Sequence, residues 1–213
     1  MIIPDSPQAR ESAARIISSG GVISFRTDTF YGLGADPLNE AAVLRIRELK
    51  GRDDRKPILL LLADVREVDR FIAVRSPLFT QLAERFWPGP LTIVDTASEL
   101  PDALTAQSKT IGVRLPNDET VRTLVRCCGG ALTATSANTS GSPPAATAQS
   151  VADYFGETVD LIVDCGESTL LEPSTVVDVS TGVVQIVRAG AVPAIEIQAV
   201  IDDAGKSNRP HHR

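Results

Sequence analysis

The chain has 213 residues, a formal net charge of −6 at pH 7, and 43% hydrophobic and 23% charged residues. These proportions are typical of a globular protein, and the length is sufficient to bury a core without disulfide bonds. An acidic chain is not built as a whole to coat nucleic acid, because cationic side chains supply most of that affinity. The N-terminal stretch MIIPDSPQARESAARII has no basic flank and no long apolar run. We therefore expect no signal peptide, no membrane span and a cytoplasmic location.

The cysteine and histidine content restricts the chemistry further. Cys127, Cys128 and Cys165 form no CxxC pair and are odd in number, which argues against a disulfide framework or a zinc knuckle. His211 and His212 lie in the C-terminal SNRPHHR, and we expect residues 205–213 to be a disordered tail. Because these are the only two histidines, a Ser-His or Cys-His pair and a His-bound metal are excluded from the folded part. We predict no metal-ligating residues, and catalysis must use Lys, Arg, Ser, Thr, Asn and carboxylates.

Apolar spacing, capping residues and β-branched runs predict helices and strands that do not alternate strictly. Ser6-Pro7 begins a helix, and Ser76-Pro77 begins another that stops at the WPGP of residues 87–90. The segment 58–63 is apolar on both faces, which predicts a buried central strand. The helices are expected at 7–18, 40–50, 77–86, 118–127, 147–155 and 193–203, and the strands at 22–27, 58–63, 91–95, 111–116, 131–137, 161–166, 174–180 and 183–189. This pattern predicts one α/β (α+β) domain over residues 1–204, with a large twisted mixed sheet flanked by helices.

Two polar segments follow predicted elements in the first quarter of the chain, where functional residues concentrate. The segment RTDTFYGLG (26–34) leaves a strand and has two glycines that let backbone approach a ligand. An ordinary glycine turn with satisfied hydroxyls is the alternative. The segment KGRDDRKP (50–57) carries cations up to a buried strand. A helix-terminal cation at Lys50 and a solvated charged loop are the alternatives there.

Two further segments combine hydroxyls with arginines. The loop SANTSGSPP (136–144) can donate hydrogen bonds to phosphate or carboxylate oxygens, or it is a simple Ser/Gly/Pro loop. Ser136 has no histidine to activate it as a nucleophile. Arg114 lies inside an apolar strand, and Arg188 accompanies Ser174 on the terminal hairpin. Buried arginines need an anion, which is either a structural carboxylate or a ligand.

Seven motifs in this order resemble the YrdC family, and within it the threonylcarbamoyl-AMP synthases. The motifs are TDTFYGLGAD, LKGR-DDRKP, FWPGPLT, TIGVRLP, TSANTSG, STVVDV and VRAGAV, and the resemblance extends from about Gln8 to Ile195. It implies a YrdC-like domain with a cationic ligand cavity and L-threonylcarbamoyladenylate synthase activity, a nucleotidyl transfer. The implied substrates are ATP with Mg²⁺, L-threonine and bicarbonate. The product would pass to a separate tRNA threonylcarbamoyl transferase, with weak or no direct binding of tRNA by this chain.

The resemblance also implies a role for individual residues. Arg52 and Lys56, with Lys50 beside them, correspond to the catalytic cations that hold the ATP phosphates. Arg114 corresponds to the arginine that binds the threonine carboxylate. The other implied threonine contacts are Thr29, Ser136 and Ser174, with Leu61 where some members carry a histidine, and the other nucleotide contacts are Thr110, Asn138 and Arg188.

Three positions depart from the family pattern. Arg26 replaces the proline that usually precedes TDT, Leu61 replaces the histidine, and Ala146 replaces a hydroxyl residue near the nucleotide. The length matches the short form of the family, without the additional C-terminal domain. Two alternatives remain at this level. One is another carbamoyl-adenylate-forming branch of the family, and the other is an RNA-binding module, against which the 4% aromatic content and acidic charge argue.

Overall fold

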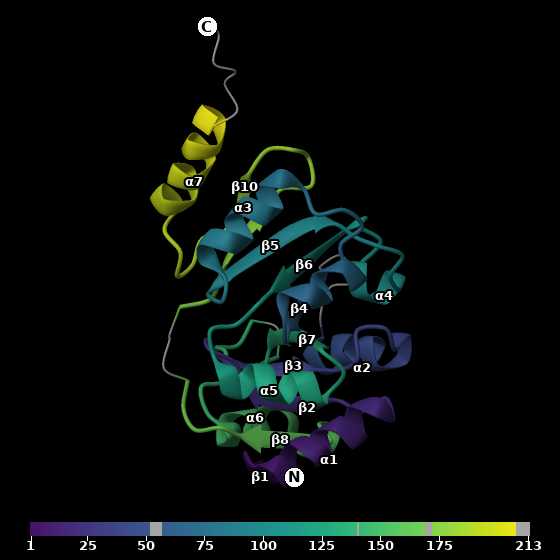
Figure 1. Cartoon of the computed structure of the whole chain (residues 1–213). Coiled ribbons are helices and arrows are strands. Elements are labelled where there is room, and N and C mark those ends of the chain that lie inside the picture. Colours follow the sequence, from purple (N-terminus) through teal and green to yellow (C-terminus); the bar gives the residue numbers. More distant parts are fainter. Residues whose placement is uncertain (52–56, 140, 169–171, 208–213) are drawn as a thin grey trace, which may run out of the picture.

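The structure of the protein, a computed structural model, describes residues 1–51, 57–139, 141–168 and 172–207 (Figure 1). Within these residues the strands form one sheet in the order β1-β8-β2-β3-β7-β4-β6-β5-β9-β10. The strands are β1 (Ile2–Pro4), β2 (Ile23–Arg26), β3 (Tyr31–Gly34), β4 (Leu59–Leu62), β5 (Leu91–Thr96), β6 (Thr110–Arg114), β7 (Ala131–Ser136), β8 (Leu161–Asp164), β9 (Thr175–Asp178) and β10 (Gln185–Arg188). The helices are α1 (Pro7–Ser18), α2 (Glu40–Lys50), α3 (Pro77–Phe86), α4 (Asp102–Thr105), α5 (Glu119–Cys127), α6 (Ala148–Phe155) and α7 (Ala194–Ser207), with 3₁₀ turns η1 (Val65–Arg70) and η2 (Gly156–Thr158).

The sheet is mixed, as the sequence predicts. β4 runs parallel to β6 on one side and antiparallel to β7 on the other, so the apolar strand 58–63 is an interior strand. The predicted helix starts are also confirmed, because the Ser6 and Ser76 hydroxyls each accept a backbone N–H at 3.1 Å. The α/β fold with helices flanking a large mixed sheet is therefore confirmed.

Some elements differ from the sequence prediction. Residues 31–34, for which the sequence predicts no strand, form the strand β3, which pairs with β2 and with β7. β1 was not predicted at all, and it is held by parallel pairing with β8. Helix α7 runs to Ser207, three residues into the segment expected to be disordered. None of the helices in the described part of the chain is long and apolar enough to cross a membrane.

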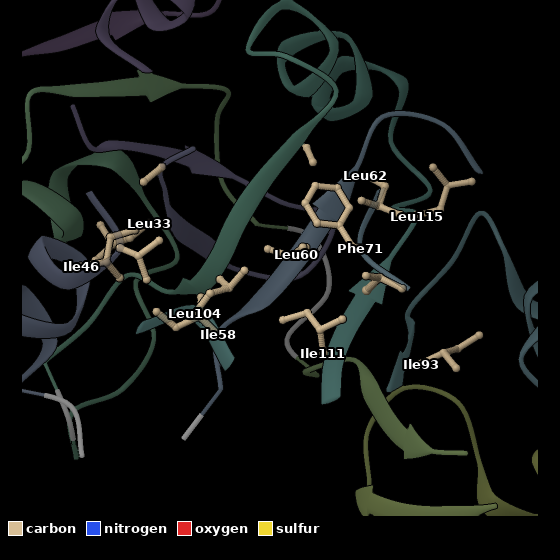
Figure 2. Packing of buried hydrophobic residues seen from close by; sticks show 14 of the residues in the cluster. Leu33, Ile46, Ile58, Leu60, Leu62, Phe71, Ile93, Leu104, Ile111 and Leu115 are labelled. Atoms are coloured by element: carbon tan, nitrogen blue, oxygen red, sulfur yellow. The ribbon is translucent and has the colours of Figure 1, made fainter. Parts of the chain in front are cut away.

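The core occupies both faces of the sheet, and β4 shows how one strand serves both. Leu60 and Leu62 join the larger cluster, part of which Figure 2 shows around Phe71. Leu61 points the other way, into a cluster with residues of α1 and α5, which lie against each other (Figure 1). Successive strand side chains alternate between faces, so a fully apolar strand needs cover on both.

Candidate active site

A cavity of about 540 Å³ lies over the middle of the sheet, on the face to which Leu61 points. The strands bring distant parts of the chain to it, because Leu61 is in register with Arg114 of β6, and Gly32 of β3 with Ser136 of β7. Eight residues that the sequence singles out line this cavity: Thr29, Lys50, Leu61, Arg114, Ser136, Asn138, Ser174 and Arg188. The fold therefore gathers into one place residues that are spread over most of the chain.

Three predicted site residues are not part of this group. Thr110 begins β6, at the opposite end of the strand from Arg114, and does not line the cavity. Its hydroxyl lies 3.3 Å from the Ser108 hydroxyl, and its contact with a nucleotide stays a prediction. Arg52 and Lys56 lie outside the described residues.

The turn between β2 and β3 presents the Thr29 hydroxyl to the cavity. The Thr27 hydroxyl donates to the carbonyl of Phe30 at 2.7 Å and accepts the backbone N–H of Thr29 at 3.1 Å. The Thr29 hydroxyl lies 3.0 Å from that of Thr27. Because the single Thr27 proton is already used, Thr29 must be the donor in this contact. The Thr29 oxygen then keeps lone pairs that can accept from an ammonium or amine.

Arg114 has a structural carboxylate partner, which settles one of the alternatives left open by the sequence. Its guanidinium forms a buried ion pair with Asp28, and its Nε donates to the carbonyl of Gly89 at 3.2 Å. Asp28 also accepts the backbone N–H of Asn117 at 3.3 Å. The pair locks the β2–β3 turn to the end of β6 while Arg114 still lines the cavity. Sequence reasoning missed the role of Asp28, although a carboxylate between two threonines of a turn was a visible signal.

Arg188 is held differently. Its Nε and Nη2 donate to the carbonyl of Ser174 at 3.1 and 2.8 Å, and Nη2 donates to the Ser174 hydroxyl at 3.0 Å. In the part of the chain that the structure describes, no carboxylate pairs with it. The Arg188 side chain as a whole is exposed, but partial desolvation of its guanidinium and the nearby charge of Arg114 lower its pKa. Both effects penalise the cation, so an anionic ligand at this position would be stabilised.

Lys50 is a tether between α2 and the loop after β7. It is buried at the last position of α2, followed by Gly51 at φ 54°, the left-handed conformation that glycine adopts at helix ends. Its ammonium donates to the carbonyls of Ser136 and Asn138 at 2.5 and 2.9 Å and to the Asn138 side-chain oxygen at 3.1 Å. Because the Lys50 ammonium already has three acceptors in this loop, Lys50 is suited to holding the loop in position. Its predicted catalytic contact with ATP phosphates remains a prediction.

The loop after β7 is folded on itself around Asn138. The Ser136 hydroxyl donates to the Asn138 side-chain oxygen at 2.6 Å. The Asn138 amide nitrogen donates to the carbonyls of Thr139 and Ser142 at 3.1 and 2.5 Å. The loop is therefore an ordered polar wall of the cavity, and its two side chains hold each other in place.

The electrostatic character of the cavity follows from these contacts. Among the described residues, its lining contains the cations Lys50, Arg114 and Arg188 together with several hydroxyls, and no carboxylate. Asp28 offsets the charge of Arg114, so Lys50 and Arg188 leave the site with a net positive charge, and a cationic concave site walled by low-dielectric protein concentrates anions. In the described ranges, no group of three or more His, Cys, Asp or Glu side chains could hold a metal ion.

Some lining residues were not singled out from the sequence. Thr92 of β5 is fully buried and its hydroxyl lies 2.9 Å from that of Ser174. Tyr31 of β3 also lines the cavity, although its side chain packs in the larger cluster with Leu33, and its hydroxyl donates to the carbonyl of Gly166 at 2.8 Å. Both belong to motifs quoted above, FWPGPLT and TDTFYGLGAD. For Thr92, the position between Leu91 and Ile93, which join the larger cluster, was the signal that could have placed it on the opposite, cavity face.

The fold and the site define an α/β protein with a cation-lined cavity over the middle of its sheet. The chain belongs to the Sua5/YciO/YrdC family, described as "Telomere recombination", which matches residues 15–190.

Similar proteins support this membership. A threonylcarbamoyl-AMP synthase of Thiobacillus denitrificans is 41% identical over 171 residues, covering 80% of this chain and 89% of that protein. The threonylcarbamoyl-AMP synthase of Pyrococcus abyssi is 37% identical over 192 residues, covering 90% of this chain and 56% of that protein. The structure of P. abyssi Sua5 complexed with L-threonine superposes with a TM-score of 0.89 at 35% identity, covering 94% of this chain and 59% of that one. The chain thus spans little more than half the length of the archaeal relative.

Proposed function

We propose that the protein is a threonylcarbamoyl-AMP synthase that uses L-threonine, bicarbonate and ATP. The observation that carries the proposal is the cavity with three cations, a set of hydroxyls and no carboxylate among its described lining residues. The substrates bring a triphosphate, a carboxylate and a carbamate to one place, so they need this concentration of positive charge. The names of the Thiobacillus and Pyrococcus relatives, and the L-threonine in the Sua5 structure, point to the same substrates.

The proposed reaction has two steps. The amine of L-threonine attacks bicarbonate, and loss of water gives the carbamate. A carbamate oxygen then attacks the α-phosphorus of ATP, the bond to the β-phosphate oxygen breaks, and pyrophosphate leaves. Thr29, whose hydroxyl oxygen is free to accept, is proposed to orient the amine, and Arg114 and Ser174 to bind the threonine carboxylate. Positioning and charge neutralisation supply the rate enhancement, as in other phosphoryl transfers.

The nucleotide side of the cavity is proposed to involve Arg188 and Asn138, with Arg52 and Lys56 on the phosphates. Mg²⁺ would arrive bound to the ATP phosphates and neutralise part of their charge. This assignment fits a cavity whose described lining holds cations and neutral donors but no carboxylate cluster for a resident ion.

The test is pyrophosphate release by the purified protein. We expect release from ATP only when L-threonine and bicarbonate are both present. Release that does not depend on threonine would overturn the synthase proposal and favour another branch of the family. The matched control is the same assay in degassed buffer without added bicarbonate.

We also propose that the product passes to a separate transferase that modifies tRNA. The protein should therefore bind tRNA only in the non-specific range, with a Kd of about 10⁻⁴–10⁻⁶ M at physiological salt. Titration of tRNA at two salt concentrations measures this. Nanomolar binding, or modified tRNA formed by this protein alone, would contradict the hand-off and favour an RNA-binding role.

A further inference from the structure

The Ser174 hydroxyl has two polar neighbours in the protein, and they constrain where its proton points. Arg188 Nη2 lies 3.0 Å from the Ser174 oxygen, and the Thr92 hydroxyl lies 2.9 Å from it. A guanidinium only donates hydrogen bonds, so Ser174 accepts from Arg188. The direction of the Thr92–Ser174 bond is then the remaining question.

The burial of Thr92 decides which of the two hydroxyls is the donor. Its side chain has 0% exposure, and no other hydrogen bond to its hydroxyl is present in the described part of the chain. If Ser174 donated to Thr92, the Thr92 proton would be buried without an acceptor, which native proteins avoid. Thr92 is therefore the donor. The Ser174 oxygen then accepts from both neighbours, and its own proton is free to point away from them.

The free proton faces the ligand cavity. Ser174 is itself buried, at 3% exposure, and lines that cavity beside Arg188. The charge of Arg114 is close enough to lower the pKa of Arg188. A hydroxyl donor beside the Arg188 guanidinium, in a cavity that Arg114 also lines, matches an anionic oxygen of a carboxylate or of a phosphate.

We infer that Thr92 is a positioning residue: by donating to Ser174 it fixes the Ser174 hydroxyl as a donor to an anionic substrate oxygen. The inference rests on the proposed function for the identity of the substrates. The bonded pair is 82 residues apart in the chain, and register places it, because Thr92 pairs with Val176 of β9, two residues beyond Ser174.

The experiment removes the donor without changing the shape of the side chain. We expect Thr92→Val to raise the KM of one substrate about tenfold, the loss expected for one hydrogen bond to a charged oxygen, with kcat changed less than threefold. Titrating L-threonine and ATP separately shows whether the oxygen belongs to the carboxylate or to a phosphate. Thr92→Ser should return the KM to within about twofold of wild type, because it restores the hydroxyl.

Two comparisons separate positioning from a structural effect. In a Ser174→Ala background Thr92→Val should have no further effect on KM, because its target is gone. Thr133→Val is the matched control. Thr133 is also fully buried, its hydroxyl accepts from the backbone N–H of Ala35 at 2.8 Å, and it does not line the cavity. This variant should leave both KM values unchanged.

The inference is overturned if Thr92→Val leaves both KM values within twofold of wild type, or if its effect multiplies with that of Ser174→Ala. Thr92→Ala provides a second hydroxyl-free variant should the valine variant fail to fold. Wild-type protein that binds L-threonine and ATP by calorimetry but releases no pyrophosphate would overturn the proposed function alone. The same variants are then compared by their dissociation constants.

Discussion

Replacing Arg188 by alanine should separate ligand binding from fold stability. Among the described residues, the guanidinium hydrogen-bonds the carbonyl and hydroxyl of Ser174 and pairs with no carboxylate, and its partial desolvation together with the charge of Arg114 lowers its pKa. The fold therefore gains little from this cation. We expect Arg188→Ala to change the free energy of unfolding by less than about 1 kcal/mol.

The ligand, by contrast, should lose a strong contact. A hydrogen bond to a charged group contributes about 1.5–3 kcal/mol, which corresponds to a loss of about 10- to 150-fold in affinity. We expect the lost affinity to be that for ATP, because the family resemblance implies that Arg188 contacts the nucleotide. Pyrophosphate release measured as a function of ATP concentration gives the loss in kcat/KM, and urea unfolding gives the stability.

Arg114 provides the contrast. Its ion pair with Asp28 is buried, with side-chain exposures of 6% and 7%, so Arg114→Ala leaves a buried carboxylate without its partner. Such a loss costs about 3–5 kcal/mol of stability. Arg15→Ala, on the exposed surface of α1, controls for the loss of a positive charge. The reasoning is refuted if Arg188→Ala turns over ATP like wild type, or destabilises the protein more than Arg114→Ala.

Two further predictions concern the catalytic cations and the amino-acid pocket. Lys56→Ala and Arg52→Ala should each lower turnover about a hundredfold, as for the loss of a transition-state charge contact, and near-full activity of Lys56→Ala would reject the phosphate assignment. Leu61 is buried beside Arg114 and lines the cavity, so we expect it to contact the threonine methyl group, a contact of about 1–3 kcal/mol. Leu61→His should then change the ratio of the kcat/KM values for threonine and serine, and an unchanged ratio would place Leu61 outside the pocket.

Local sequence determined most of the elements. Ser6, Ser76 and the glycines after α1 act within a few residues of the helix ends that they define, so helix boundaries could be predicted closely. The apolar run of β4 predicted an interior strand for the same reason, because both faces of a single strand are visible in its own residues. β3 was missed, since its residues form a strand only through pairing with β2 and β7.

The sequence by itself also determined the chemistry available to the site: no histidine before residue 211, arginines in apolar strands, and hydroxyls at strand ends. Tertiary structure decided which of these groups meet. Asp28, 86 residues from Arg114, is its ion partner, and Thr92, 82 residues from Ser174, directs its hydroxyl. No local pattern encodes either pair, because each depends on the order and register in which strands from distant parts of the chain join one sheet.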